Sequence, residues 1–105
     1  MKDIEKFLEA ICEEDFVEGH EVLEDRWREL KKNPETLDES KILKGLINGS
    51  TALALKIMGK ETGAKTVWST FEKYRPLIQS VPCVDTANYK IAEKMLDDKY
   101  QKYMI

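Results

Sequence analysis

The chain has 105 residues, of which 42% are apolar and 35% are charged, and this composition fits one compact domain with a single core rather than two domains. No apolar run reaches about 18 residues, which argues against a membrane span, and the first residues lack the apolar segment of a secretory signal, so we expect a cytoplasmic protein. The net charge of −3 lacks the basic excess that is typical of nucleic-acid-binding domains.

Apolar residues recur with helical periodicity along nearly the whole chain, and no segment alternates as a strand would. The first predicted helix spans residues 3–13. The second spans residues 15–32 and ends at Asn33, because Pro34 disfavours helix in the residue before it. The first helix carries an apolar stripe and an acidic opposite face, and the second carries an apolar stripe at helical spacing.

The third predicted helix, over residues 39–58, is the least polar and follows a capping region at Asp38 and Ser40. One of its faces is broad and apolar. A second face carries a stripe of small residues, at Gly45, Gly49 and Ala52. Small residues let a neighbouring helix or a large ring approach closely, so this helix is expected at the centre.

Residues 59–63 break the pattern and predict a turn into a fourth helix over residues 62–79. Pro76 predicts a kink or an end near Tyr74, because proline inside a helix removes a hydrogen bond and clashes with the preceding turn. A fifth helix is predicted over residues 85–103. It is expected to present to the core Ala87, Ile91, Ala92, Met95, Leu96 and Tyr103.

Charge is distributed unevenly along the chain. Residues 1–40 carry 14 acidic and 6 basic side chains, a net charge of −8, whereas residues 41–105 carry 6 acidic and 11 basic ones, a net charge of +5. We expect acidic helices to pack beside basic ones, within the fold or across a dimer. The alternative is an acidic surface for a cation or a basic partner.

One polar pair interrupts the apolar stripe of the second predicted helix. His20 falls between Phe16 and Trp27, and Glu24 lies one turn further on, at the edge of the stripe. A buried imidazole and a buried carboxylate both need hydrogen-bond partners. We therefore expect His20 and Glu24 to bind each other in a buried structural network.

The same residues allow a second interpretation, a site in which His20 is a base or ligand and Glu24 orients it. The candidates for catalysis are His20, Glu21 and Glu24. The candidates for ligand binding are Glu18, His20, Glu24, Trp27, Lys44 and Asn48.

Known metal signatures do not fit this segment. The H-E-x-x-H pattern needs a second histidine where Glu24 stands, and a di-iron bundle needs glutamate where Val17 stands as well as a second histidine, but His20 is the only one. Cys12 and Cys83 are far apart and lack a second cysteine nearby, so free thiols are expected rather than a disulfide or zinc framework. We expect no metal and no cofactor.

Three blocks carry a family resemblance: FVEGHEVLEDRWR at 16–28, KILKGLIN at 41–48 and GKETGA at 59–64. Together they resemble the small all-helical proteins of domain-of-unknown-function family 309, over about residues 15–79, with the first and last predicted helices outside the match. Lys44 and Asn48 stand where the family pattern has glutamine, and Lys60 stands where it has asparagine. The resemblance implies a compact helical bundle and no established biochemical activity.

The expected fold is a single all-α bundle of about five helices over residues 1–105, with the glycine-lined third helix at its centre. The expected function is that of a non-enzymatic module that self-associates as a homo-oligomer or docks a protein partner, without nucleic acid or membrane. The alternative is a small-ligand, metal-binding or hydrolytic site built on His20, Glu21 and Glu24.

Overall fold

The computed structural model describes residues 2–104, and within that range it contains helices and no strand, which confirms the all-α prediction. The helices in chain order are α1 (Lys2–Cys12), α2 (Phe16–Val22), α3 (Glu24–Lys31), the 3₁₀ segment η1 (Pro34–Thr36), α4 (Leu37–Ile57), α5 (Glu61–Tyr74), α6 (Leu77–Ser80) and α7 (Thr86–Tyr103). There are more helices than the five expected, because two of the predicted helices are interrupted.

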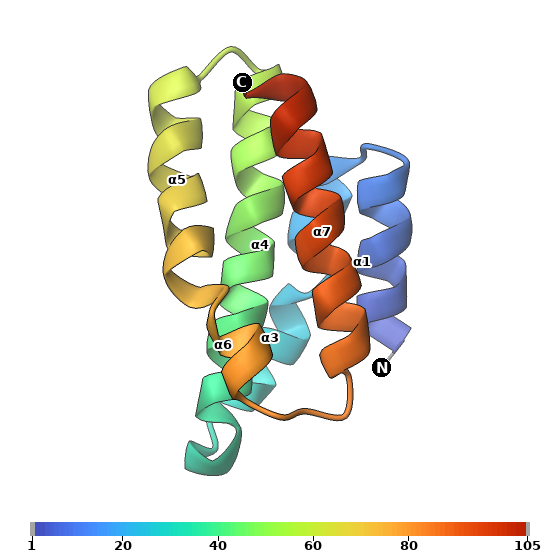
Figure 1. Cartoon of the computed structure of the whole chain (residues 1–105), viewed down its shortest axis with the longest axis vertical. Helices are drawn as coiled ribbons and strands as arrows, with labels where there is room; N and C mark the ends of the chain where they lie inside the picture. The colour runs from blue at the N-terminus through green and yellow to red at the C-terminus, as the bar shows by residue number, and fades with distance from the viewer. Residues whose placement is uncertain (1, 105) are drawn as a thin grey trace.

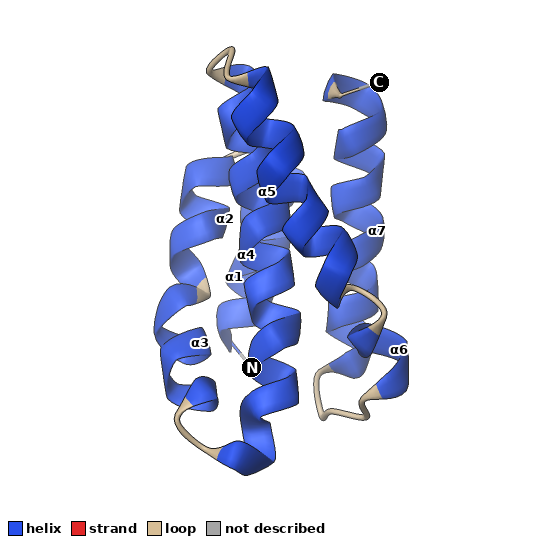
Figure 2. Cartoon of the chain, turned by 90° about the vertical axis from the view of Figure 1, so that its left-hand side faces the viewer, coloured by secondary structure: helices blue, strands red, loops and turns tan. Residues whose placement is uncertain are grey.

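Helix α4 lies at the centre of the bundle, as its composition predicts (Figure 1). It packs against α2, α3, α5, α6 and α7, while α1 packs against α2 and α7. The chain runs along one side of α4 through α2 and then α3, and it returns through α4 in the opposite direction (Figure 2). The start of α2 therefore lies beside the end of α4, and α3 lies beside the first half of α4.

The second predicted helix is interrupted at Leu23, which separates α2 from α3. Neither glycine nor proline marks this position, so nothing in the local sequence predicts the break. Leu23 is fully buried, and its carbonyl oxygen accepts a hydrogen bond from the Trp27 amide at 2.9 Å. The interruption thus accompanies the insertion of Leu23 into the core, which is a tertiary effect.

Two predicted helix boundaries lie near prolines, the end of the fourth helix and the start of the third, and the structure confirms only the first of these. The fourth predicted helix does end at Tyr74, and a short α6 resumes after Pro76, which confirms the prediction. The start of the third predicted helix was placed too late, since α4 begins at Leu37 directly after η1. Asp38 and Ser40 therefore lie inside the first turn, where the Ser40 hydroxyl donates to the Leu37 carbonyl at 2.5 Å.

The small-residue stripe of α4 is where α5 and α7 approach closely. A Cβ atom placed on Gly49 would lie 2.9 Å from Leu96 Cδ1 and 3.3 Å from Phe71 Cγ, and one on Gly45 would lie 3.2 Å from Tyr74 Cβ. Both distances at Gly49 are shorter than ordinary van der Waals contacts. Glycine is required there because the ring of Phe71 occupies the space that a methyl group would take.

The core face of α7 differs from the expected one. Ala92 and Leu96 are fully buried, as predicted, but Ala87 is exposed and Ile91 is half exposed. Tyr89, which the apolar pattern missed, is fully buried. Its hydroxyl donates to a Glu39 carboxylate oxygen at 2.6 Å, and burial together with this bond raises the pKa of Tyr89. The hydrogen bond to α4 is what allows a phenol to lie in the core.

The acidic and basic halves of the chain meet at Glu14, in the turn between α1 and α2. Its carboxylate accepts hydrogen bonds from Lys99 Nζ at 2.8 Å and Lys102 Nζ at 2.7 Å, and from the hydroxyl of Tyr103. These partners, Lys102 first, lower the pKa of Glu14 from 4.5 to about 2. Glu14 adopts a left-handed backbone with φ of 61°, a conformation that is uncommon for a side chain other than glycine or asparagine. Three hydrogen-bond donors from α7 hold it in place.

No helix in the described part of the chain combines the length and the apolarity needed to cross a bilayer.

Candidate functional site

The predicted polar pair forms. His20 Nε2 lies 2.9 Å from Glu24 Oε1, and the second oxygen of Glu24 accepts a hydrogen bond from Arg28 Nη2 at 2.9 Å. Because His20 is in α2 and Glu24 is the first residue of α3, the pair bridges the break at Leu23. It therefore connects the two halves of the interrupted helix.

The expectation that this pair is buried is wrong. The His20 side chain keeps 38% of its surface exposed and the Glu24 side chain keeps 29%. The helical wheel placed His20 in the middle of the apolar stripe, but the break at Leu23 ends the regular rotation that the wheel assumes. The pair sits at the rim of the core, in contact with solvent.

His20 lies instead on a groove between α2–α3 and α4. At one end of this groove, residues from both sides line a cavity of 230 Å³. The lining combines an imidazole, a carboxylate, an indole, an ammonium and an amide: His20, Glu24, Trp27, Lys44, Ile47, Asn48 and Thr51. Five of the six residues expected at a ligand site are thus brought together.

Three polar side chains in this cavity, those of Asn48, Thr51 and Glu24, have hydrogen-bond or ion-pair partners within the protein. Asn48 Nδ2 donates to the Lys44 carbonyl at 2.7 Å, and Thr51 Oγ1 donates to the Ile47 carbonyl at 2.9 Å. The amide oxygen of Asn48 and the hydroxyl oxygen of Thr51 keep the capacity to accept a hydrogen bond. Both oxygens of Glu24 are already engaged, one by His20 and one by Arg28. The Glu24 charge is therefore largely offset by protein groups.

The groove continues from His20 toward the end of α4 and becomes apolar. A second cavity of 140 Å³ shares His20 and Thr51 with the first and adds Val17, Ala54, Leu55 and Met58. A third cavity of 150 Å³ shares Val17, Ala54 and Met58 with the second and extends to Ile57, and its lining also includes Phe16 and the acidic residues Glu14 and Asp15. We call this continuous feature the α2–α4 groove. From Lys44 to Met58 it follows about 21 Å of α4, at 1.5 Å per residue.

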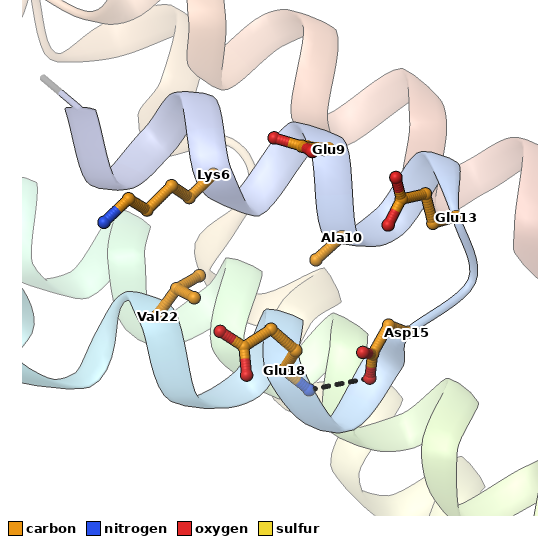
Figure 3. A pocket seen from close by; sticks show the side chains of 7 residues that line it. All are labelled: Lys6, Glu9, Ala10, Glu13, Asp15, Glu18 and Val22. Atoms are coloured by element: carbon orange, nitrogen blue, oxygen red, sulfur yellow. Dashed lines mark hydrogen bonds between the residues drawn. The ribbon is translucent and has the colours of Figure 1, made fainter.

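Two of the predicted site residues lie elsewhere. Glu18 lines a separate cavity of 200 Å³ between α1 and α2, together with Lys6, Glu9 and Glu13 from the other side of the gap (Figure 3). Glu21 is exposed and lines neither part of the groove around His20. Neither Glu18 nor Glu21 therefore joins Glu24 in the cavity at His20, and residues 2–104 hold no group of three or more histidine, cysteine or acidic side chains that could hold a metal ion.

Sequence reasoning missed three contributors to this surface. Thr51 and Ile47 line the cavity because they lie one turn from Asn48 and Lys44 on the same face of α4, and that i, i+3, i+4 spacing is the signal that would have found them. Lys31, at the end of α3, lies over the Trp27 ring with its Nζ 4.2 Å from the ring centroid. Lys31 stands one turn after Trp27, so its helical spacing would also have predicted this contact.

These features define a small all-α bundle protein with a surface groove between α2–α3 and α4. Residues 4–67 match the domain of unknown function DUF309, and the chain belongs to this family. The match begins earlier than the resemblance predicted, so it includes α1, and it stops within α5 and leaves out α6 and α7. All residues of the α2–α4 groove fall inside it. No curated protein and no solved structure matches the chain.

Proposed function

We propose that this protein is a non-enzymatic self-association module in which two copies cover the apolar end of the α2–α4 groove. The observation that carries the proposal is the exposure of three large apolar side chains at that end. Val17 is 48% exposed, Ile57 56% and Met58 59%. Together with Ala54 they line two adjoining cavities, and we call these four residues the apolar patch.

Exposed apolar side chains that stand alone are ordinary, but a contiguous group marks an interaction surface. Complete burial of an aliphatic or methionine side chain is worth about 1.5–3 kcal/mol, and these side chains already have about half of that benefit in the monomer. The remainder, gained in both copies, opposes an association cost of roughly 4–15 kcal/mol. The proposed dimer is accordingly weak and dependent on concentration.

Charges beside the apolar patch favour a second copy over an unrelated partner. Glu21, exposed on α2, lies one turn from Val17, and Lys60, exposed in the turn after α4, lies two residues from Met58. Neither has an ion-pair partner among the described residues. A twofold interface brings the same surface of each copy together, so a negative edge on one helix and a positive edge on the other can meet their opposites.

Sedimentation equilibrium over a series of protein concentrations tests the proposal. The wild-type protein is expected to show a rising average mass, and Met58→Asp is expected to remain monomeric. Ile91→Asp is the matched control, because Ile91 is 50% exposed on α7, far from the patch in the chain, and this variant should associate like the wild type. A wild-type protein that stays monomeric at the highest concentration would refute the proposal.

A charge exchange tests the twofold arrangement itself. Glu21→Lys and Lys60→Glu should each weaken the dimer, because each places like charges opposite one another. The double variant restores opposite charges at both contacts of a twofold interface and should regain the wild-type dissociation constant. A partner of another sequence would not produce this rescue, so a double variant weaker than both single variants counts against a second copy of the chain.

A further inference from the structure

We infer that the polar end of the α2–α4 groove binds a small oxyanion, a carboxylate or a phosphate ester, attached to an apolar body. The site is the cavity lined by His20, Glu24, Trp27, Lys44, Ile47, Asn48 and Thr51, in which both carboxylate oxygens of Glu24 are already engaged by His20 and Arg28. It is distinct from the apolar patch, and binding there does not depend on self-association.

The inference starts from two ammonium groups gathered at one indole ring. Lys31 Nζ lies 4.2 Å from the centroid of the Trp27 ring, and Lys44 Nζ lies 6.0 Å from it. Within residues 2–104 neither ammonium has a carboxylate at ion-pair distance, although the chain carries an excess of acidic side chains. Lys44, which also lines the cavity, therefore stands beside the indole ring as a cation without a protein counter-ion, and an anionic ligand can supply one.

The remaining charges around Trp27 do not supply that anion. Glu24 is held by His20 Nε2 and by Arg28 Nη2, and Asp25 is held by Arg28 Nη1 at 2.9 Å. In the cavity lining the carboxylate of Glu24 is thus already paired, whereas the ammonium of Lys44 has no carboxylate at ion-pair distance among residues 2–104. An anionic ligand would pair with Lys44, although the net charge of the chain is −3.

The other lining groups define the rest of the ligand. Ile47 is buried in the floor, and the Trp27 ring forms a half-buried wall, so an apolar or planar body has a surface to pack on. The Asn48 amide oxygen and the Thr51 oxygen can accept a hydrogen bond from a ligand hydroxyl or amine. The volume of 230 Å³ is below the range of about 300–1,000 Å³ that is usual for drug-sized ligands, so the ligand is small.

A titration followed by NMR tests the inference with three probes that share a phenyl ring: benzoate, phenyl phosphate and benzamide, the neutral analogue of benzoate. The signals to follow are the indole N–H of Trp27 and the side-chain amide of Asn48, since both groups line the cavity. At least one of the two anions should shift both signals at millimolar concentration, and benzamide should bind at least about tenfold more weakly, a difference of about 1.4 kcal/mol. The anion that binds more tightly shows whether the site prefers a carboxylate or a phosphate ester.

Lys44→Gln removes the charge and keeps a hydrogen-bonding side chain of similar length, and it should raise the dissociation constant of the anion about tenfold or more. Lys90→Gln on α7, an exposed lysine outside the groove, is the matched control and should leave binding unchanged. The inference is overturned if neither anion shifts the two signals, if benzamide binds as well as the anions, or if both lysine variants lose the same affinity.

Discussion

Gly19 lies on the face of α2 that meets α4, and its replacement by alanine tests how closely the two helices are packed. A Cβ atom placed there would lie 2.6 Å from Ser50 Oγ and 3.0 Å from Ile11 Cδ1. Ser50 is fully buried, and its hydroxyl donates to the Phe16 carbonyl at 2.7 Å. The hydroxyl can therefore make room only by giving up that hydrogen bond.

The expected magnitude follows from opposing contributions. Glycine to alanine inside a helix gains about 1 kcal/mol from propensity. Leaving the Ser50 hydroxyl buried without a partner costs about 1–3 kcal/mol, and crowding against Ile11 costs about 1 kcal/mol or more. Gly19→Ala should therefore destabilise the protein by about 1–3 kcal/mol, which corresponds to a fall in Tm of at least about 4 °C for a domain of this size.

Urea denaturation at neutral pH measures the effect, and two variants sharpen it. Gly63→Ala is the control, since a Cβ atom there meets only Leu55 Cδ1 at 3.7 Å and should stabilise α5 by about 0.5–1 kcal/mol. In a Ser50→Ala background the crowded oxygen is gone, so Gly19→Ala should become nearly neutral. If Gly19→Ala stabilises the wild-type protein as Gly63→Ala does, the packing argument is refuted.

Two further predictions concern the polar clusters. Glu14→Gln should destabilise the protein near neutral pH, and the difference in stability from the wild type should shrink as the pH falls from about 4.5 toward 2. The reason is that the depressed pKa of Glu14 contributes stability only while its carboxylate is ionised. Thermal melts of both proteins across that pH range measure the difference, and a difference that stays constant would contradict the prediction. His20→Ala should cost no more than about 0.5 kcal/mol in urea denaturation, because an exposed i, i+4 pair with Glu24 contributes little; a loss above about 2 kcal/mol would indicate a buried network instead.

The helices and most of their ends were predictable because their signals are local. Pro76 ended α5 at the expected residue, and the small residues of α4 predicted the close approach of a helix or a large ring, which proves to be Phe71 at Gly49. The His20–Glu24 contact was predictable for the same reason, since residues one turn apart are neighbours on any helix. Periodicity did not predict the break at Leu23, and that break changed the exposure assigned to His20.

Tyr89 shows the limit of reading a core from apolar pattern alone. A phenol counts as half polar in such a pattern, and its burial depends on Glu39, a residue 50 positions away in another helix. Glu14 is a similar case, because its partners lie on α7 at the far end of the chain. Hydrogen bonds of this kind become visible only when the helices have been packed.

The amino-acid sequence by itself determined that the chain is helical, which helix is central, and that an imidazole and a carboxylate stand four residues apart, within reach of each other. The packing of α2 and α3 against α4 decided the rest: that Lys44 and Asn48 lie beside His20, that Trp27 lies near two ammonium groups, and that Val17 and Met58 share one exposed surface. Helical periodicity reports on residues a few positions apart, whereas these contacts join segments that are far apart in the chain. The relative position of those segments depends on how buried side chains such as Leu23 and Ser50 fill the space between the helices.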